Sequence, residues 1–418
     1  MMQTANEITR EIILLKISGE DKPGVTAPIT EVLASHEVHV LDIGQAVIHN
    51  ALSLGILIEI PDHKNASDVL RDVLFRAHQL ELQVRYDTIP EYKYESWVAN
   101  QGKMRYIVTL LGKKLSARQL ADLSRIIYEE GLNIDKIQRL TGRISLKELH
   151  HSQNACVEFS IRGMPENSQQ FRAKLFDFGN NNDVDVSFQL DSVYRRIRRL
   201  VVFDMDSTLI NTEVIDELAK AVGVGEQVAG ITEQAMRGEI GFDESFRKRV
   251  ALLKGLDESV LKKIAARLPL NEGAERVTNI LRSLGFKTAI LSGGFTYFGY
   301  ELQKRLKIDY VYANELDIRN GKVTGKVAGR IVNGKRKAEL LHEIARKEGI
   351  HLEQVIAVGD GANDLPMINE AGLGIAFRAK PMVREQSRQT LTHTGLDGIL
   401  YLLGMRDRDI MNEKLVKV

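Results

Sequence analysis

The sequence predicts an α/β protein in which two small modules precede a larger domain built around a parallel sheet. Strand and helix patterns in residues 11–89 follow the order β-α-β-β-α-β. The same order recurs with a period of roughly 90 residues, which indicates an internal duplication. Beyond Arg199, apolar strands alternate with helices, as is typical of a parallel sheet covered on both faces.

The first module, residues 1–96, begins with the strand pattern "EIILLKISGE", which "DKPG" interrupts before a helix. Its β-α-β-β-α-β order is the ferredoxin-like, split βαβ arrangement. The expected strands are 11–20, 38–49, 52–60 and 82–89, and the expected helices are 25–36 and 66–80.

The second module, residues 97–191, repeats this order after the polar segment 90–103. Ser116 and Gln119 have the spacing of a capping box, which supports a helix start there. The expected strands are 104–112, 133–140, 155–161 and 183–190, and the expected helices are 116–130 and 167–179.

The third domain, residues 192–418, contains the apolar strands "LVVFD", "KTAILS", "VIAVGD" and "LGIAF". Residues 214–271 have helical patterns without a strong strand, so we expect them to form an inserted cap. Asn320 and Gly321 lie between alternating segments and predict a type I′ hairpin that projects from the sheet.

Composition excludes several classes of partner. The chain has 57 Lys plus Arg against 56 Asp plus Glu, so no global charge attracts nucleic acid or a membrane surface. The basic run "RRIRR" has no interleaved aromatic residues and is interpreted as a charged helix end or linker. We expect a cytoplasmic protein, because no signal sequence or membrane span is visible and the single cysteine, Cys156, excludes a disulfide framework.

Two aspartates, Asp204 and Asp206, follow the first strand of the third domain in "LVVFDMDSTLI". Strand periodicity lets both project to one side, at the strand end where parallel sheets bind ligands. Neighbouring carboxylates repel each other unless a cation binds or one is protonated, and Mg²⁺ prefers such oxygen ligands. From the five residues "DMDST" alone, a turn in which the aspartates cap the following helix is an equally good explanation.

Two later strand ends carry matching polar residues. "AILSGGF" places Ser292 and Gly293 before a helix, where free amides favour an anion. "VAVGDGANDLPM" adds a third carboxylate, Asp360, at the same sheet edge. Between them lie Lys335 and Lys337, of which one is expected to contact a phosphate group.

In this order, "DMDSTLI", "LSGGF", the lysine and "GDGANDLPM" resemble the four motifs of the haloacid dehalogenase superfamily of phosphatases, over about residues 199–402. The resemblance implies a Rossmann-like parallel-sheet core with a helical cap. It narrows to phosphoserine phosphatases because Glu213 and Arg249 match substrate-binding positions of that family. The two N-terminal modules resemble ACT domains through "DKPGV", whose Pro-Gly the second copy lacks.

The resemblance implies a role for each motif residue. Asp204 is the expected nucleophile, forming an aspartyl-phosphate, and Asp206 the general acid and base. The phosphoryl oxygens are expected to be held by Ser292, the Gly293 amide and Lys337. One Mg²⁺ per site is expected on Asp204, the Asp206 carbonyl and Asp360, with Asp364 and Asn363 supporting the loop and Asn363 also near the substrate.

The expected reaction is Mg²⁺-dependent hydrolysis of O-phospho-L-serine to L-serine and phosphate, the final step of serine biosynthesis. Glu213 suits the substrate ammonium and Arg249 its carboxylate. Two alternatives stay open. One is a phosphatase or phosphotransferase for another small phosphorylated amino acid or alcohol, and the other is an amino-acid-binding regulator with a vestigial phosphatase domain.

The N-terminal half contributes no residue to this chemistry, so a regulatory role is expected. Gly24 closes the first strand-to-helix loop, and Gly131 ends the corresponding helix of the second copy. Each also has an ordinary explanation, as a loop residue and a helix C-cap. Together they suggest an L-serine effector site, and by resemblance we expect a homodimer.

Overall fold

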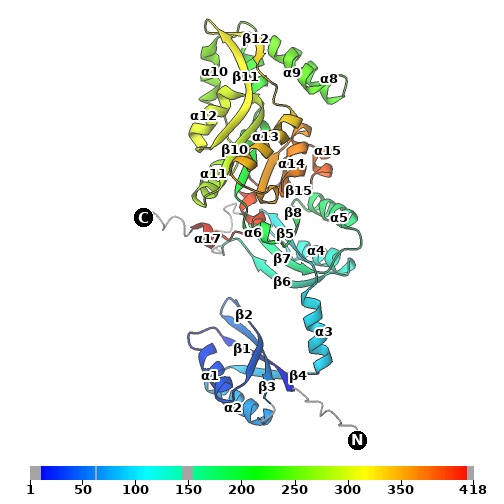
Figure 1. The fold of residues 1–418 in the computed structure, drawn as a ribbon, viewed down its shortest axis with the longest axis vertical. Helices are drawn as coiled ribbons and strands as arrows, with labels where there is room; N and C mark the ends of the chain where they lie inside the picture. The colour runs from blue at the N-terminus through cyan, green and yellow to red at the C-terminus, as the bar shows by residue number, and fades with distance from the viewer. Residues whose placement is uncertain (1–10, 62–63, 144–153, 412–418) are drawn as a thin grey trace. The chain divides into compact units, whose positions relative to one another are not determined.

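The computed structural model describes residues 11–61, 64–143 and 154–411. The chain divides into two compact units, Met1–Lys103 and Met104–Val418, and each is described by itself. Figure 1 shows the elements in chain order. No helix within the described ranges combines the length and apolar character that crossing a bilayer requires.

The first unit has the predicted ferredoxin-like arrangement. Its antiparallel sheet has the order β2-β3-β1-β4, and helices α1 and α2 lie beside it (Figure 1). Buried side chains of both helices complete the core. The polar segment after the sheet, for which no helix was predicted, contains helix α3, Glu91–Gln101, which has no buried residue. The module consists of β1 Glu11–Glu20, α1 Thr26–Ser35, β2 His39–Ile48, β3 Ala51–Ile60, α2 Ala66–Gln79 and β4 Gln83–Ile89.

The second unit begins with another module of the same topology, with sheet order β6-β7-β5-β8. The predicted capping box is present: the Gln119 amide donates to Ser116 Oγ at 3.2 Å, and the Ser116 amide donates to Gln119 Oε1 at 2.8 Å. The module consists of β5 Arg105–Gly112, α4 Ala117–Glu129, β6 Asn133–Arg139, β7 Ala155–Arg162, α5 Ser168–Asn181 and β8 Asp185–Leu190.

A seven-stranded sheet of order β12-β11-β10-β9-β13-β14-β15 forms the rest of this unit. All neighbours are parallel except β11 and β12, which form the predicted hairpin, with positive φ at Asn320 (52°) and Gly321 (71°). Strand β15 was not predicted, because three residues are too short for a pattern. The strands are β9 Leu200–Phe203, β10 Lys287–Phe295, β11 Tyr310–Arg319, β12 Lys322–Ala328, β13 Val355–Gly359, β14 Leu373–Phe377 and β15 Gln389–Leu391.

Helices pack on this sheet, and a helical segment is inserted after β9. Residues 214–271, all of which the structure describes, contain four helices and no strand, as predicted. The hairpin binds this cap segment, since Gly255 donates to Val323 O at 2.8 Å and Val323 donates to Leu256 O at 2.9 Å. The cap helices are α7 Val214–Ala221, α8 Gly225–Met236, α9 Phe242–Ala251 and α10 Glu258–Ala265; the others are α11 Ala274–Ser283, α12 Thr296–Leu306, α13 Gly334–Lys347, α14 Leu365–Glu370, α15 Pro381–Gln386, α16 Gly398–Leu402 and α17 Asp407–Met411.

The second module and the seven-stranded domain share one core. Leu111, Leu140 and Cys156 of the module pack in the same cluster as Phe203 of β9. Cys156 is fully buried and burial raises the pKa of its thiol well above the usual value, as expected for a packed and unreactive thiol. The first two residues of the connecting "RRIRR" run end helix α6, Val193–Arg196, and the other three lead into β9, so the run is a helix end and linker as predicted.

Candidate active site

Asp204 follows β9, the central strand of the sheet, and its amide donates to Val358 O on β13 at 2.8 Å. This places the residue at the carboxyl edge of the sheet. Its side chain is buried, and Oδ1 accepts a hydrogen bond from the Met205 amide at 2.6 Å. Because one carboxylate oxygen is occupied in this way, Oδ2 is the atom that faces other groups of the site.

Asp206 lies beyond the strand, in the turn formed by residues 205–209. The strand ends at Phe203, so the turn, and not the alternation of a strand, brings Asp206 to the site. Ser207 has a positive φ of 54°, which reverses the chain. Asp206 Oδ1 then accepts from the amide of Val214, the first residue of α7, at 3.0 Å. The same carboxylate therefore belongs to the site and fixes the start of the cap.

Ser292 and the glycines after it lie at the carboxyl end of β10, next to β9. Ser292 is fully buried, and its Oγ accepts from the Gly294 amide at 2.9 Å. A Cβ atom at Gly294 would lie 2.4 Å from Asp206 Oδ2, closer than any real contact, so only glycine allows this approach. The Gly293 carbonyl is fixed by Asn314 Nδ2 at 2.8 Å.

Lys337 on α13 is fully buried, and its Nζ lies 3.0 Å from Asp204 Oδ2 and 2.6 Å from Asp364 Oδ1. Lys335 is exposed, so the structure brings Lys337 into the site and leaves the other candidate lysine in solvent. Burial opposes the charge of Lys337, but the Asp204 and Asp364 carboxylates outweigh it and raise its pKa. The lysine is therefore a permanent cation beside Asp204.

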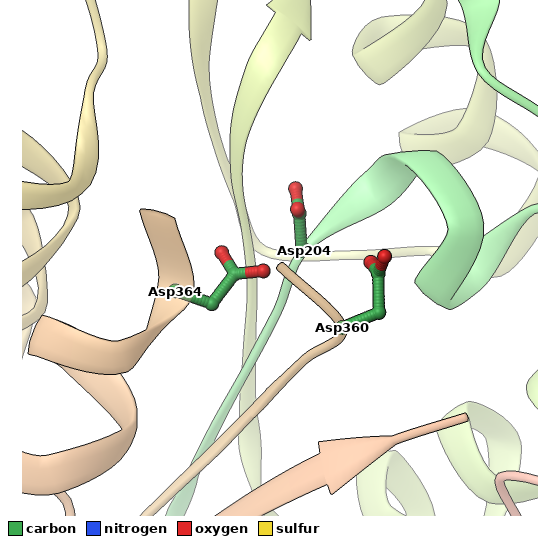
Figure 2. Close-up of side chains that lie close together, drawn as sticks. All are labelled: Asp204, Asp360 and Asp364. Atoms are coloured by element: carbon green, nitrogen blue, oxygen red, sulfur yellow. The ribbon is translucent and has the colours of Figure 1, made fainter. Parts of the chain in front are cut away.

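Three carboxylates converge at this edge: Asp204 after β9, Asp360 after β13, and Asp364 in the following 3₁₀ turn Ala362–Asp364. Figure 2 shows Asp364 directed toward Asp204, while Asp204 and Asp360 extend in the same direction. One oxygen of each lies within 4.8 Å of the others. Asp360 Oδ1 accepts from Thr208 Oγ1 at 3.0 Å, and Asp364 Oδ2 accepts from the Gly361 amide at 3.0 Å. The set can therefore hold a cation.

The negative charge of the cluster exceeds what Lys337 neutralises. Burial raises the pKa of Asp204 well above normal, and nearby Asp364 raises it further. Burial also raises the pKa of Asp206 well above normal, and Glu213 adds to this shift. Burial and then Asp364 raise the pKa of Asp360 to about 7. A group that binds here must therefore either supply positive charge or let one carboxyl keep its proton.

Glu213 and Arg249 come from the cap. Glu213 is exposed and accepts from Ser207 Oγ at 2.6 Å. In "RKR" the first two residues are exposed, whereas Arg249 turns inward, and its Nε is buried without a hydrogen-bond partner in the described part of the chain. Burial lowers the pKa of Arg249, while Glu213 and then Asp216 act in the opposite direction. Arg249 is therefore a cation poorly solvated by its surroundings.

Comparison with known proteins agrees with this geometry. Residues 198–372 match the haloacid dehalogenase-like hydrolase family, and residues 11–87 match the ACT domain family. The chain is 39% identical to a phosphoserine phosphatase of Streptomyces coelicolor, covering 95% of this chain and 93% of that protein. The chain belongs to the phosphoserine phosphatase family. Phosphoserine phosphatase SerB2 of Mycobacterium tuberculosis is 37% identical over 95% of this chain and 94% of its own.

Solved structures share the fold of this phosphoserine phosphatase family member. A haloacid dehalogenase family hydrolase of Salmonella enterica superposes with a TM-score of 0.61 at 30% identity, over 71% of this chain and 98% of that one. The unliganded structure of a probable phosphoserine phosphatase of Vibrio cholerae superposes with a TM-score of 0.56 at 31% identity, over 75% of this chain and 89% of that one. The predicted α/β fold with an ACT domain at its N-terminus is confirmed.

Sequence reasoning missed Asn271, a residue that supports this phosphoserine phosphatase site. Its buried Nδ2 donates to the carbonyls of Ser207, Thr208 and Ile210 at 3.1, 2.8 and 3.2 Å. Arg378 Nη1 lies 3.4 Å from its Oδ1. Asn271 therefore holds the turn that carries Asp206, at the point where the chain returns from the cap. No local pattern distinguishes this asparagine from one in a loop.

Proposed function

We propose that this chain hydrolyses O-phospho-L-serine to L-serine and phosphate through a phosphoryl-enzyme intermediate on Asp204. The observation that carries the proposal is Asp204 Oδ2 held 3.0 Å from the buried Nζ of Lys337, between Asp360 and Asp364 at the end of the central strand. A carboxylate fixed beside a permanent cation is both a nucleophile and a place for a phosphoryl group. The names of the two full-length relatives support the choice of substrate.

In the first step, Asp204 Oδ2 attacks phosphorus and the bond from phosphorus to the serine oxygen breaks. In the second, water attacks the phosphorus of the aspartyl-phosphate and restores the carboxylate. The Lys337 ammonium and the hydroxyl of Ser292 hold phosphoryl oxygens as negative charge shifts between them. The amide of Gly293 is proposed to donate to the same oxygens.

Asp206 is the proposed general acid and base. Burial and then Glu213 raise the pKa of its carboxyl, which favours the protonated form that a general acid needs. The Val214 amide occupies Oδ1, which leaves Oδ2, beside Gly294, to deliver the proton to the serine oxygen. The carboxylate left behind then accepts a proton from the attacking water.

The carboxylate cluster fits a single Mg²⁺, because oxygen donors from several loop positions meet with excess negative charge. We propose Asp204, Asp360 and the backbone carbonyl of Asp206 as its protein ligands. Asp364, which bonds Lys337 and the Gly361 amide, orients the loop around them. When bound, the ion would act as a Lewis acid on the phosphoryl oxygens and offset the repulsion among the carboxylates.

Recognition of the serine part is assigned to the cap. Arg249, whose buried Nε has no partner among the described residues, suits a carboxylate, and Glu213, beside Ser207, suits an ammonium. Asn363 lies in the loop after β13, close to Gly293, and is proposed to face the substrate. These groups would distinguish phosphoserine from simple phosphate esters.

The deciding experiment measures phosphate release from a panel of phosphorylated amino acids and small alcohols, with and without Mg²⁺. Phosphoserine is expected to give the highest kcat/KM, and chelation of the metal is expected to abolish turnover. A preference for another phosphate ester would favour the broader phosphatase alternative. No turnover of any ester by folded protein would leave a vestigial domain.

The proposed regulation rests on the two ACT-like modules, one in each unit. We propose that L-serine, formed in the cytoplasm, binds near Gly24 of the first module and near Gly131 of the second, and that it inhibits without competing with phosphoserine. Both glycines are exposed and have a positive φ, of 86° and 67°. Replacing either glycine by valine is expected to weaken inhibition, whereas Gly285→Val, at another open position of φ 81°, controls for backbone strain. Purely competitive inhibition by serine would contradict the proposal.

We also propose a homodimer. Strand β2 forms an edge of the first sheet and exposes Val40, Ile43 and Ile48. An exposed apolar edge strand is a surface that a second copy can cover. Sedimentation is expected to show a dimer that Ile43→Lys weakens, and a monomeric parent protein would contradict this assembly.

A further inference from the structure

A cavity of about 520 Å³ lies within the second unit, between the second module and the seven-stranded domain. Helix α5 and strand β8 line one side, and residues 384–393 line the other. Its volume is in the range of sites for small molecules. It shares no residue with the carboxylate site described above.

Three arginines line this cavity without an ion pair among the described residues: Arg172 on α5, Arg384 on α15 and Arg388 before β15. Within the described residues, Arg172 donates only to backbone carbonyls, of Phe188 at 3.3 Å and Arg388 at 3.5 Å. Arg384 donates to Asn180 Oδ1 at 3.0 Å, and its Nε is buried with no partner in the ranges that the structure describes. The positive charge of the cavity is therefore not neutralised by protein groups that hydrogen-bond to it.

Neither of the two acidic lining residues forms an ion pair with these arginines among the described residues. Asp185 accepts from the amides of Thr392, His393 and Thr394, so its carboxylate is used to join β8 to the segment after β15. Glu385 is exposed on α15. Burial first, and then the nearby Arg388, lower the pKa of Arg172, as expected for cations that share a space without a counter-ion.

Aromatic rings orient two of the guanidinium groups. The Arg172 guanidinium carbon lies 4.9 Å from the centre of the Phe188 ring, and that of Arg384 lies 5.7 Å from the centre of Phe176. Stacking on a ring leaves the edge of a guanidinium free to bind a carboxylate or phosphate with two parallel hydrogen bonds. The rings also provide apolar surface for the body of a ligand.

We propose that this cavity is a binding site for a small organic or inorganic anion that carries at least two carboxylate or phosphate groups. At least two are required because the free guanidinium groups come from opposite walls, α5 of the module and residues 384–388 of the neighbouring domain. A bound anion joins the two walls. The site is separate from the substrate site and from the glycines proposed to bind serine.

The test is isothermal titration of the full-length chain in metal-free buffer with citrate and, separately, with pyrophosphate. The two ligands distinguish a carboxylate site from a phosphate site. Arg388→Gln, which alters an exposed residue, is expected to weaken binding about ten- to a hundredfold through loss of a charge-assisted contact. Arg384→Gln is expected to do the same, whereas Arg282→Gln, on the exposed face of α11, removes the same charge without effect.

Arg388→Gln and Arg282→Gln are expected to unfold at the parent temperature, Arg384→Gln is expected to unfold slightly lower because it loses the contact with Asn180, and all three variants are expected to keep the parent kcat for phosphoserine. Binding of neither anion to the parent protein would overturn the proposal. Equal affinity in Arg388→Gln, Arg384→Gln and the parent protein would also overturn it, because the anion would then bind elsewhere, including at the carboxylate site.

Discussion

Replacing Asn271 by alanine tests whether a residue outside the four motifs controls the position of Asp206. The Asn271 carboxamide has two N–H groups and faces three carbonyl acceptors, so it makes two full hydrogen bonds at a time. At about 1 kcal/mol net for each, the alanine variant is expected to lose about 2 kcal/mol of unfolding free energy. That loss lowers the melting temperature of a unit of this size by a few degrees.

The larger effect is expected in catalysis. Without this amide, the turn of residues 207–210 loses its support, and a displacement of Asp206 by about 1 Å costs on the order of a hundredfold in rate. We expect kcat for phosphoserine to fall by about ten- to a hundredfold, with a smaller change in KM, because Arg249 lies outside the turn. Asn271→Asp is expected to lower kcat further than Asn271→Ala, because a buried carboxylate would face the same carbonyl oxygens.

The assays are phosphate release at saturating and limiting phosphoserine, and thermal unfolding. Asn369→Ala, on the exposed face of α14, serves as the matched control and is expected to change neither kcat nor the melting temperature. If Asn271→Ala kept the parent kcat while losing stability, Asn271 would be a structural residue only. Unchanged kcat together with unchanged stability would refute the reasoning about this hydrogen-bond set.

Three further substitutions test the chemistry. Asp204→Asn is expected to abolish both turnover and trapping of labelled phosphate on the protein, and stoichiometric labelling of the variant would rule Asp204 out as nucleophile. Gly294→Ala places a Cβ 2.4 Å from Asp206 Oδ2 and so displaces the proposed general acid. We expect kcat to fall more for phosphoserine than for p-nitrophenyl phosphate, because the nitrophenolate leaving group needs little protonation. Gly230→Ala, which places its Cβ in open space, is the control. Arg249→Gln is expected to reduce kcat/KM for phosphoserine about ten- to a hundredfold and to leave kcat/KM for p-nitrophenyl phosphate unchanged. The control, Lys248→Gln, should change kcat/KM for neither ester. Equal losses on both esters in Arg249→Gln would argue against carboxylate recognition.

Residues at strand ends could be predicted from the sequence, because apolar runs give the strands and a parallel sheet brings their ends together. This reasoning placed Asp204, Ser292 and Asp360 at one edge, where the structure has them. The choice of Lys337 over Lys335 needed the family resemblance, because both lie at the start of the same helix and only packing decides which is buried.

Features that depend on contacts distant in the sequence could not be predicted. Asn271 lies more than 60 residues after the carbonyls it binds, and nothing near it indicates that contact. Helix α3 has no buried face, so the periodicity that identifies other helices is missing. The cavity requires α5 and the segment after α15 to meet, although they are about 200 residues apart.

The shared core of the second module and the seven-stranded domain sets where the chain can be shortened. Leu111 packs closely on Gly398, because a Cβ added at position 398 would lie 3.0 Å from Leu111 Cδ2. Gln389 forms two hydrogen bonds with the backbone of Phe188, one to its amide and one to its carbonyl. A fragment that starts near residue 192 would leave these apolar and polar surfaces open to water and prone to aggregate. A fragment that starts at Met104 keeps them covered, so protease trimming should stop near the end of α3 and yield a product that still hydrolyses phosphoserine.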